Sequence, residues 1–463
     1  MRFLMVSGNQ EQLPFPVAPL GALCVAGSLQ EAGHSVDLVD LCFARSPCED
    51  LRTVLQEGGY DAVGLSIRNL DNCLYGNPVS YFDQFRRLAE TVRAAADVPL
   101  ILGGSGFSAA SRGWIERLDA FCGIIGEGER ALPQVLEALD RGEEPDAVPN
   151  VIRRGQTRPP TPVLDIDLDC IPLPAHEHCD YEQYLSRGGF VGVQAKRGCP
   201  FHCIYCTYPL LEGCSYRVRH PERVVDEIAT VHQSTGAGYY FFTDSVFNAP
   251  RDHALAICRE IARRGLRVQW MSYCNPVGFD RELAHAMAEA GCIGVEFGLD
   301  AVTDKMLLAM GKPFGLDEIR VSLEAAAHAR IPFAVHLLFG GPGEDVADVE
   351  DAQEFLDSCA APDAVFASVG IRLYADTPAE RIARELGALA ADADLFEPVY
   401  FVSEGLGKDP VGVLDGIARR RPAWSTQADW QRPVLQVAQR LANRNGERPQ
   451  WRHIRDYGEY LRW

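Results

Sequence analysis

Three cysteines within eight positions are the strongest chemical signal in this sequence of 463 residues. Cys199, Cys203 and Cys206 form a C-x3-C-x2-C pattern inside "RGCPFHCIYCTYP" (197–209). Reduced thiols gathered on a surface loop are prone to oxidation, so their clustering favours a bound metal. Thiolates are soft ligands that select zinc or an iron–sulfur cluster. The pattern therefore predicts a metal centre in this loop.

The number of cysteines bears on which metal is bound. Structural zinc takes four nitrogen or sulfur ligands, commonly as two pairs, and no second C-x2-C pair follows in the chain. His202 and Cys214 could still complete a zinc site, so zinc remains an alternative. An iron–sulfur cluster held by three cysteines would leave one iron open to a further ligand, and the spacing favours this arrangement.

The overall composition restricts the partners. A formal net charge of −20 and an isoelectric point near 5.0 argue against nucleic acid or an anionic membrane as the main partner. The first residues lack the apolar core of a signal peptide, and no run of about 18 apolar residues occurs. Fifteen cysteines without a secretion signal predict reduced thiols in a cytoplasmic protein.

The elements that must position the chemistry alternate along the chain. Residues 1–140 alternate short apolar runs with amphipathic stretches, which predicts a Rossmann-like, doubly wound parallel sheet. Ligands of such sheets bind at the carboxyl ends of the strands. The predicted strands are residues 2–7, 35–40, 62–67, 99–104 and 121–126. The turns at that edge carry "SIRNLDN" (66–72), "GGSGFS" (103–108) and "GEGER" (126–130).

The rest of the chain predicts a second α/β unit. Residues 141–184 are rich in Pro and Asp and are expected to form a linker. Residues 185–382 contain six strand–helix repeats, which predict a partial (β/α)6 barrel of the TIM type with its chemistry at the carboxyl ends of the strands. The cysteine loop directly follows the first barrel strand. Residues 383–463 are expected to form a helical appendage.

The cysteine loop, with the aromatic Tyr205 before its last cysteine, resembles the radical S-adenosylmethionine superfamily. Similar motifs follow in order through the predicted barrel. They are "RVRHPERVVDEI" (217–228), "FFTDSVFN" (241–248), "GVEFGLDAVTDKMLLAMGK" (294–312), "FGGPGED" (339–345) and "IRLYADTP" (371–378). The resemblance implies that Cys199, Cys203 and Cys206 ligate a 4Fe-4S cluster whose open iron binds S-adenosylmethionine.

The resemblance also implies contacts to S-adenosylmethionine. Tyr205 is expected near the adenine, and the other candidate contacts are Asp244, Ser272, Glu296 and Arg372. Each of these four has an ordinary alternative: Asp244 as a helix cap, Ser272 as a strand-end hydroxyl, and Glu296 with Arg372 as a structural ion pair. His336, in the middle of an apolar strand, either points into the barrel or is a hydrogen-bonded core histidine.

The first domain resembles the cobalamin-binding domain that precedes such barrels. "PFPVAPLGALCVAGSLQEAGHSVDLVDL" (14–41) and the three edge turns are typical of that subgroup. The implied cobalamin contacts are Ser66, Arg68, Asn69, Gly103, Gly104, Gly126, Glu127 and Gly128.

One departure from that subgroup concerns cobalt. Many cobalamin domains carry D-x-H-x-x-G after the second strand, whereas this chain has Asp40-Leu41-Cys42-Phe43-Ala44-Arg45. Cobalamin then binds without a protein ligand to cobalt, or Cys42 is the ligand, or the domain has lost the cofactor; the first reading is favoured. Arg68 either lies beside the corrin, where a guanidinium cannot coordinate cobalt, or pairs with Asp71 or Asp61.

The resemblance implies a methyltransferase that acts on an unactivated carbon, or on phosphorus, of a small molecule. Cleaved S-adenosylmethionine would supply a 5′-deoxyadenosyl radical, and methylcobalamin the methyl group. The alternatives are cyclisation or another rearrangement, aminocarboxypropyl transfer from S-adenosylmethionine, and a non-catalytic cobalamin or iron–sulfur carrier. The expected partners are a small-molecule substrate and an external electron donor such as flavodoxin or ferredoxin.

Overall fold

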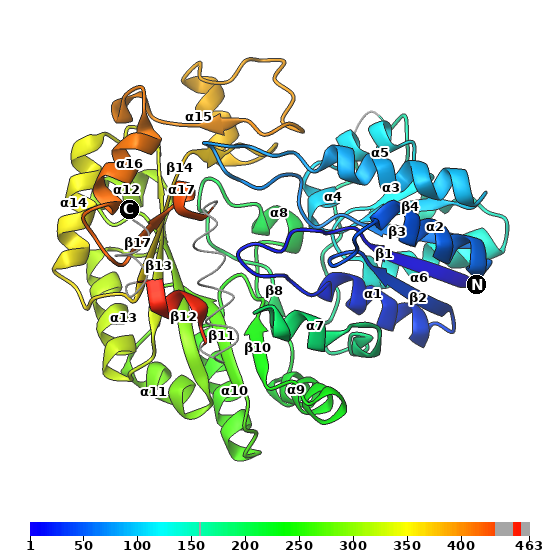
Figure 1. The fold of residues 1–463 in the computed structure, drawn as a ribbon, viewed down its shortest axis with the longest axis horizontal. Helices are drawn as coiled ribbons and strands as arrows, with labels where there is room; N and C mark the ends of the chain where they lie inside the picture. Colours follow the sequence, from blue (N-terminus) through cyan, green and yellow to red (C-terminus); the bar gives the residue numbers. More distant parts are fainter. Residues whose placement is uncertain (157–158, 431–447, 455–463) are drawn as a thin grey trace.

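The computed structural model describes residues 1–156, 159–430 and 448–454. Two sheets of mainly parallel strands lie side by side in it (Figure 1). The first sheet has six strands in the order β2-β1-β3-β4-β5-β6, and all pairs are parallel except β5 with β6. Its strands are β1 Arg2–Ser7, β2 Ser35–Asp40, β3 Ala62–Ser66, β4 Leu100–Gly103, β5 Cys122–Ile124 and β6 Val151–Ile152. The doubly wound sheet predicted for the first domain is confirmed.

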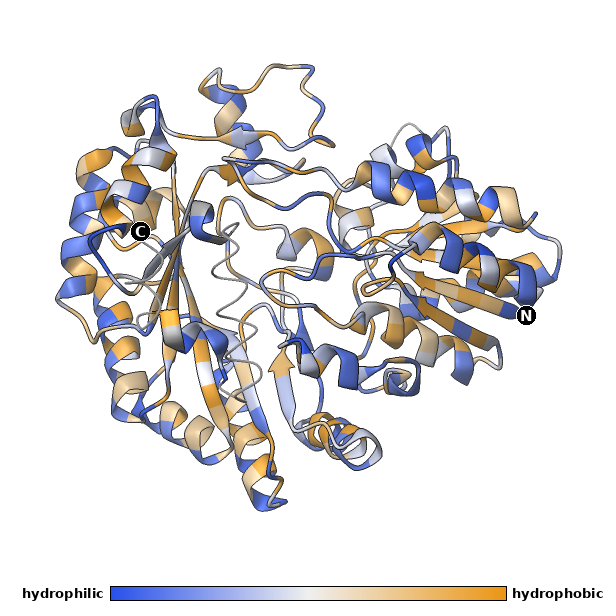
Figure 2. Cartoon of the chain, in the orientation of Figure 1, coloured by the Kyte–Doolittle hydropathy of each residue, from blue (hydrophilic) through white to orange (hydrophobic). Residues whose placement is uncertain are grey.

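Both faces of the first sheet are covered because its strands are apolar on both sides. In β1, Phe3 and Met5 pack toward α1 and α6, whereas Leu4 and Val6 pack toward α2, α3 and α5. Figure 2 shows the hydrophobic residues concentrated along the strands. The helices are α1 Leu20–Glu31, α2 Pro47–Gly58, α3 Phe82–Ala95, α4 Ser105–Ala109, α5 Ser111–Leu118 and α6 Gly128–Asp140.

The second sheet is entirely parallel and follows the order β17-β14-β13-β12-β11-β10-β7. β7 and β17 are its two edges, so the sheet is an open, partial barrel. Its strands are β7 Val191–Val193, β10 Tyr239–Phe242, β11 Gln269–Cys274, β12 Cys292–Asp300, β13 Phe333–Phe339, β14 Ala364–Val369 and β17 Trp424–Thr426. The helices between strands are α9 Pro221–Thr235, α10 Arg251–Arg263, α11 Arg281–Glu289, α12 Asp304–Ala309, α13 Leu316–His328 and α14 Val346–Asp357.

The barrel differs from the predicted six strands by the added strand β17. It comes from the segment expected to be a helical appendage, and three residues are too few to show a strand period. Helix α15 Pro378–Glu385 crosses the predicted boundary at residue 383, and the predicted appendage also contains β16 Tyr400–Phe401, η3 Glu404–Leu406, α16 Pro410–Ala418, α17 Gln427–Trp430 and η4 Gln450–His453. The remainder of the predicted appendage, 431–447 and 455–463, lies outside the described residues.

Further short elements lie between the two sheets in the sequence or within the barrel unit. They are η1 Pro145–Ala147, η2 His176–His178, α7 Tyr181–Ser186, β8 Lys196–Arg197, α8 Tyr208–Glu212, β9 Arg217–Val218 and β15 Ile371–Arg372. Phe396, beyond α15, reaches back into the core of the first domain and packs on Phe82 and Trp114. Among the described residues, no helix is both long enough and apolar enough to cross a bilayer.

Candidate cofactor and substrate site

The cysteine loop leaves the barrel after β7 and is closed at its base by antiparallel pairing of β8 with β9. The amide of Cys199 donates to the carbonyl of Gly213 at 3.0 Å. Gly198 has φ of +86°, and a Cβ there would collide with the carbonyl of Ser215. Only glycine suits this position, so the chain can turn sharply just before the first cysteine.

The three thiols of the loop share one buried environment. Burial raises the pKa of Cys199, Cys203 and Cys206, to about 12 for Cys206, where charge on the other two thiols adds to the effect. Three thiolates therefore need a bound cationic group. The buried Tyr216 hydroxyl has no hydrogen-bond partner among the described residues and lies beside Cys199, where it can donate to a sulfur. This donor set fits a thiolate-bound cluster.

A single metal ion fits this loop poorly. Across residues 1–156, 159–430 and 448–454, no three His, Cys, Asp or Glu side chains converge closely enough to hold one ion. Thiolates on one zinc lie within about 5 Å of each other, because each Zn–S bond is about 2.3 Å long, whereas a multi-iron cluster separates its cysteines further. Cys214, the fourth ligand of the zinc alternative, is exposed.

Tyr205 is fixed by two charged residues that the sequence reading missed. Its hydroxyl donates to Asp300 at the end of β12, and Lys312 Nζ lies 3.1 Å from the same hydroxyl and 2.6 Å from the Asp300 carboxylate. Lys312 is almost fully buried. Next to it, Gly311 has φ of +65°, and a Cβ there would lie 2.6 Å from the His202 carbonyl. The segment from the end of β12 to Lys312 therefore packs against the cysteine loop.

Two of the four candidate S-adenosylmethionine contacts are buried and make their polar contacts within the chain. Asp244 is fully buried, accepts from the amides of Ala195 and Lys196, and pairs with Lys196 Nζ at 3.1 Å. Ser272 is also fully buried, with its hydroxyl 3.6 Å from the Cys274 thiol on the face that packs against helices. Because side chains alternate along β11, Tyr273 faces the interior in its place.

The other two candidates do not pair with each other. Glu296 bonds to His336 Nε2 at 2.7 Å and to Trp451 Nε1 at 2.9 Å. Arg372 instead forms a buried ion pair with Asp71 of the first domain, with 2.8 Å between Nε and Oδ2. The Glu296–Arg372 ion pair considered from the sequence is therefore absent. Arg372 serves as a contact between the two domains.

The candidate cobalamin residues lie together at the carboxyl edge of the first sheet. Ser105 donates to the Arg68 carbonyl at 2.8 Å, and Ser108 accepts from the amide of Gly126 at 2.9 Å, so the turns are linked. A Cβ at Gly104 would lie 2.5 Å from the Ile67 carbonyl, while one at Gly103 would meet open space. Ser66 ends β3, Asn69 lies against Gly106, and Gly128 begins α6.

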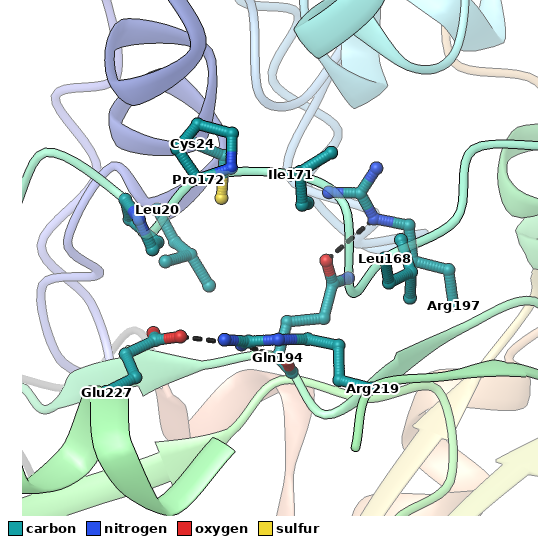
Figure 3. Close-up of a pocket in the computed structure, with 10 residues that line it drawn as sticks. Leu20, Cys24, Leu168, Ile171, Pro172, Gln194, Arg197, Arg219 and Glu227 are labelled. Atoms are coloured by element: carbon teal, nitrogen blue, oxygen red, sulfur yellow. Dashed lines mark hydrogen bonds and ion pairs between the residues drawn. The ribbon is translucent and has the colours of Figure 1, made fainter. Parts of the chain in front are cut away.

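Glu127, another candidate cobalamin contact, is engaged elsewhere. It pairs with Arg197 at 3.0 Å and with Arg217 at 2.7 Å, and Glu129 also pairs with Arg197. The three carboxylate and guanidinium groups of Arg197, Glu127 and Glu129 are more than nine-tenths buried. Figure 3 shows Arg197 with Gln194, to which its Nε donates at 2.8 Å, in a pocket that the α1 residues Leu20 and Cys24 also line. We call Arg197, Glu127 and Glu129 the interdomain clamp.

Arg68 is exposed and makes no ion pair with Asp71 or Asp61 among the described residues. The charge of Glu296 and burial raise the pKa of Tyr273, and the positive charge of Arg68 opposes this shift. Arg68 follows β3 at the carboxyl edge of the first sheet. Cys42 is buried, and burial raises its pKa to about 11, so it is a neutral thiol and a poor ligand for cobalt.

Comparisons with known proteins place these two domains in one family. The model of the B12 binding domain matches residues 10–136, and that of the radical SAM superfamily matches residues 193–356. Together they cover both the glycine turns and the cysteine loop. The chain belongs to the cobalamin-dependent radical S-adenosylmethionine family.

Relatives in this family match most of the chain. Tryptophan 2-C-methyltransferase of Streptomyces laurentii is 25% identical, over 79% of this chain and 72% of its own. Cytidylyl-2-hydroxyethylphosphonate methyltransferase of Streptomyces wedmorensis is 23% identical, over 91% and 90%. The structure of the methyltransferase TsrM from Kitasatospora setae, with tryptophan and a SAM analogue bound, is similar in fold, with a TM-score of 0.87, 24% identity, and coverage of 100% and 99%.

Only some of the site residues that were not predicted from the sequence have a recognisable sequence signal. Asp300 and Lys312 lie within the family-like stretch 294–312, as polar residues that follow an apolar strand. Trp451 lies about 150 residues beyond its partner Glu296 and gave no such signal. Trp451 thus reaches Glu296 on β12 from a segment that follows β17.

Proposed function

We propose that the chain is a cobalamin-dependent radical S-adenosylmethionine methyltransferase acting on carbon or phosphorus of a small molecule. The observation that carries the proposal is the buried clamp. Its ion pairs join Arg197, two residues before Cys199, to Glu127 and Glu129. These two glutamates follow β5 at the edge of the first sheet where cobalamin is predicted to bind. The cysteine loop is thereby held against that edge. Relatives that are methyltransferases on tryptophan and on a phosphonate support the same activity.

In this proposal, separate groups of residues hold the cluster and contact the corrin. Cys199, Cys203 and Cys206 hold a 4Fe-4S cluster, and Tyr216 donates to its sulfur. When bound, the cluster and cobalamin supply the electron that cleaves S-adenosylmethionine and the cobalt that carries the methyl group. Gly103 and Gly104 let the backbone approach the corrin closely, and Arg68 faces it without binding cobalt. An external donor such as flavodoxin or ferredoxin supplies electrons.

Methyl transfer can be tested without the substrate. The anaerobically reconstituted protein is incubated with cob(I)alamin and S-adenosylmethionine, and the products are separated by mass spectrometry. We expect S-adenosylhomocysteine at least tenfold above the same mixture without protein. Cys203→Ala removes a proposed cluster ligand and should lose iron. Cys214→Ala, a matched control in the same segment, should retain its iron.

Other products would overturn the proposal in identifiable ways. 5′-Deoxyadenosine without S-adenosylhomocysteine, in the presence of reductant, would favour cyclisation or rearrangement. Methylthioadenosine would favour aminocarboxypropyl transfer. Binding of both cofactors without cleavage of S-adenosylmethionine in any mixture would indicate a carrier.

A further inference from the structure

Glu296 and His336 form an oriented pair on neighbouring strands of the barrel. His336 Nε2 lies 2.7 Å from one carboxylate oxygen of Glu296, and Trp451 Nε1 donates to the other at 2.9 Å. A carboxylate only accepts hydrogen bonds, so Nε2 carries the imidazole hydrogen. When the ring carries a single N–H hydrogen, the network places it on Nε2 and leaves Nδ1 as an acceptor.

The Nδ1 atom of His336 is open. It has no hydrogen-bond partner among the described residues, and it is not among the buried atoms that lack one. The His336 side chain is 31% exposed, against 6% for Glu296. The imidazole therefore presents a partly exposed nitrogen on the inner face of the barrel sheet while its other nitrogen is anchored by Glu296.

Aromatic rings flank this acceptor. His336 stacks on Phe366 at 4.9 Å between ring centroids, Tyr273 meets His336 edge-on at 6.0 Å, and Phe241 meets Tyr273 at 5.2 Å. Tyr273 is 40% exposed, and yet the charge of Glu296 and then burial raise its pKa. Its ring therefore has accessible surface beside His336 and Phe241.

The acceptor lies close to the cysteine loop. His336 is paired with Gly298 in the register of β13 with β12. The Gly298 carbonyl accepts from Lys312 Nζ at 3.1 Å, and Lys312 also holds the Tyr205 hydroxyl. Three successive contacts thus link His336 to the cysteine loop through Gly298, Lys312 and Tyr205, so we expect a molecule bound at Nδ1 to lie near the proposed cofactor.

We propose that His336 Nδ1 accepts a hydrogen bond from an N–H or O–H group of a planar, ring-containing substrate that binds among Phe241, Tyr273 and Phe366. Flat rings match aromatic walls, and one oriented polar group sets the direction of binding. Glu296 and Trp451 are positioning residues that act through His336. The proposal rests on the proposed function only in taking this face of the barrel sheet as the substrate site.

The experiment compares two planar probes, indole and 1-methylindole, which differ in the N–H donor. Binding to protein loaded with iron and cobalamin is measured by calorimetry. One net hydrogen bond corresponds to about three- to tenfold in affinity, so indole should bind more tightly by that factor. His336→Phe should abolish the discrimination and keep the aromatic wall. His336→Asn, whose amide oxygen can replace Nδ1, should retain part of it.

A matched control is His285→Phe, because His285 pairs with Glu289 on the surface of α11. It should leave both affinities unchanged. Trp451→Phe, which removes the N–H donor to Glu296 and keeps an aromatic ring, should reduce the discrimination with unchanged iron content. Equal affinities for the two probes, or no binding of either at millimolar concentration, would overturn the proposal. Neither result affects S-adenosylhomocysteine formation, so failure here is distinct from failure of the proposed function.

Discussion

Replacing Arg197 by Met should destabilise the protein strongly, because Arg197 is the cation of the interdomain clamp. Its guanidinium lies 3.0 Å from Glu127 and also bonds Glu129, and all three side chains are less than one-tenth exposed. Methionine keeps most of the side-chain volume but removes the charge. Two carboxylates would then remain buried at the junction of the two domains.

The magnitude follows from which carboxylate loses its partner. Breaking a buried ion pair costs about 3–5 kcal/mol. Glu127 keeps Arg217 at 2.7 Å, so most of the cost falls on Glu129. Burial tends to raise the pKa of Glu129, but the charge and hydrogen bonds of Arg197 outweigh this and lower it. Its stabilisation is thus present above the unfolded-state pKa and is lost as the pH falls through the folded-state pKa.

The assay is urea unfolding followed by circular dichroism at pH 8 and pH 5.5. We expect Arg197→Met to lose about 3–5 kcal/mol at pH 8 and less at pH 5.5, where Glu129 can take up a proton. Arg86→Met is the matched control, since Arg86 and Glu90 form an exposed pair, and it should cost less than about 1 kcal/mol. A loss for Arg197→Met as small as that of the control would refute the reasoning.

Three further perturbations test other parts of the structure. Gly311→Ala forces a side chain against the His202 carbonyl at positive φ, so reconstituted protein should hold less iron with unchanged cobalamin; equal iron would contradict this. Burial raises the Glu344 pKa to about 7, so its stabilisation is full below about pH 4.5 and is lost as the pH rises through 7. Urea midpoints of Glu344→Gln should therefore fall less between pH 5 and 8.5 than those of the wild type. Phe396→Ala should cost about 3–5 kcal/mol in unfolding, and a cost below 1 kcal/mol would mean that this contact does not join the domains.

The strands and the cysteine loop were predictable because their signals are local. Apolar runs such as residues 2–7 became strands, since a two-faced buried strand needs apolar residues throughout. The turn before Cys199 is made by Gly198, which lies within the cysteine motif itself. Strand β17 was not predictable, because three residues carry no period and its partner β14 lies more than 50 residues earlier.

The partners of the candidate site residues were less predictable. A one-residue step along β11 decides whether Ser272 or Tyr273 faces the barrel interior. The sequence motif alone does not show which of the two side chains does so. The partner of Arg372 is Asp71, 301 residues away, and the partner of Glu127 is Arg197, 70 residues away. Such pairs depend on how the two domains pack.

The most direct measurement of the central claim is the cofactor content of the anaerobically reconstituted protein. We expect about four iron atoms and about one cobalamin per chain, with cobalamin retained and iron lost in Cys203→Ala. Stoichiometric zinc in place of iron, or no cobalamin bound to the intact protein, would contradict the assignment of a cluster loop facing a cobalamin edge.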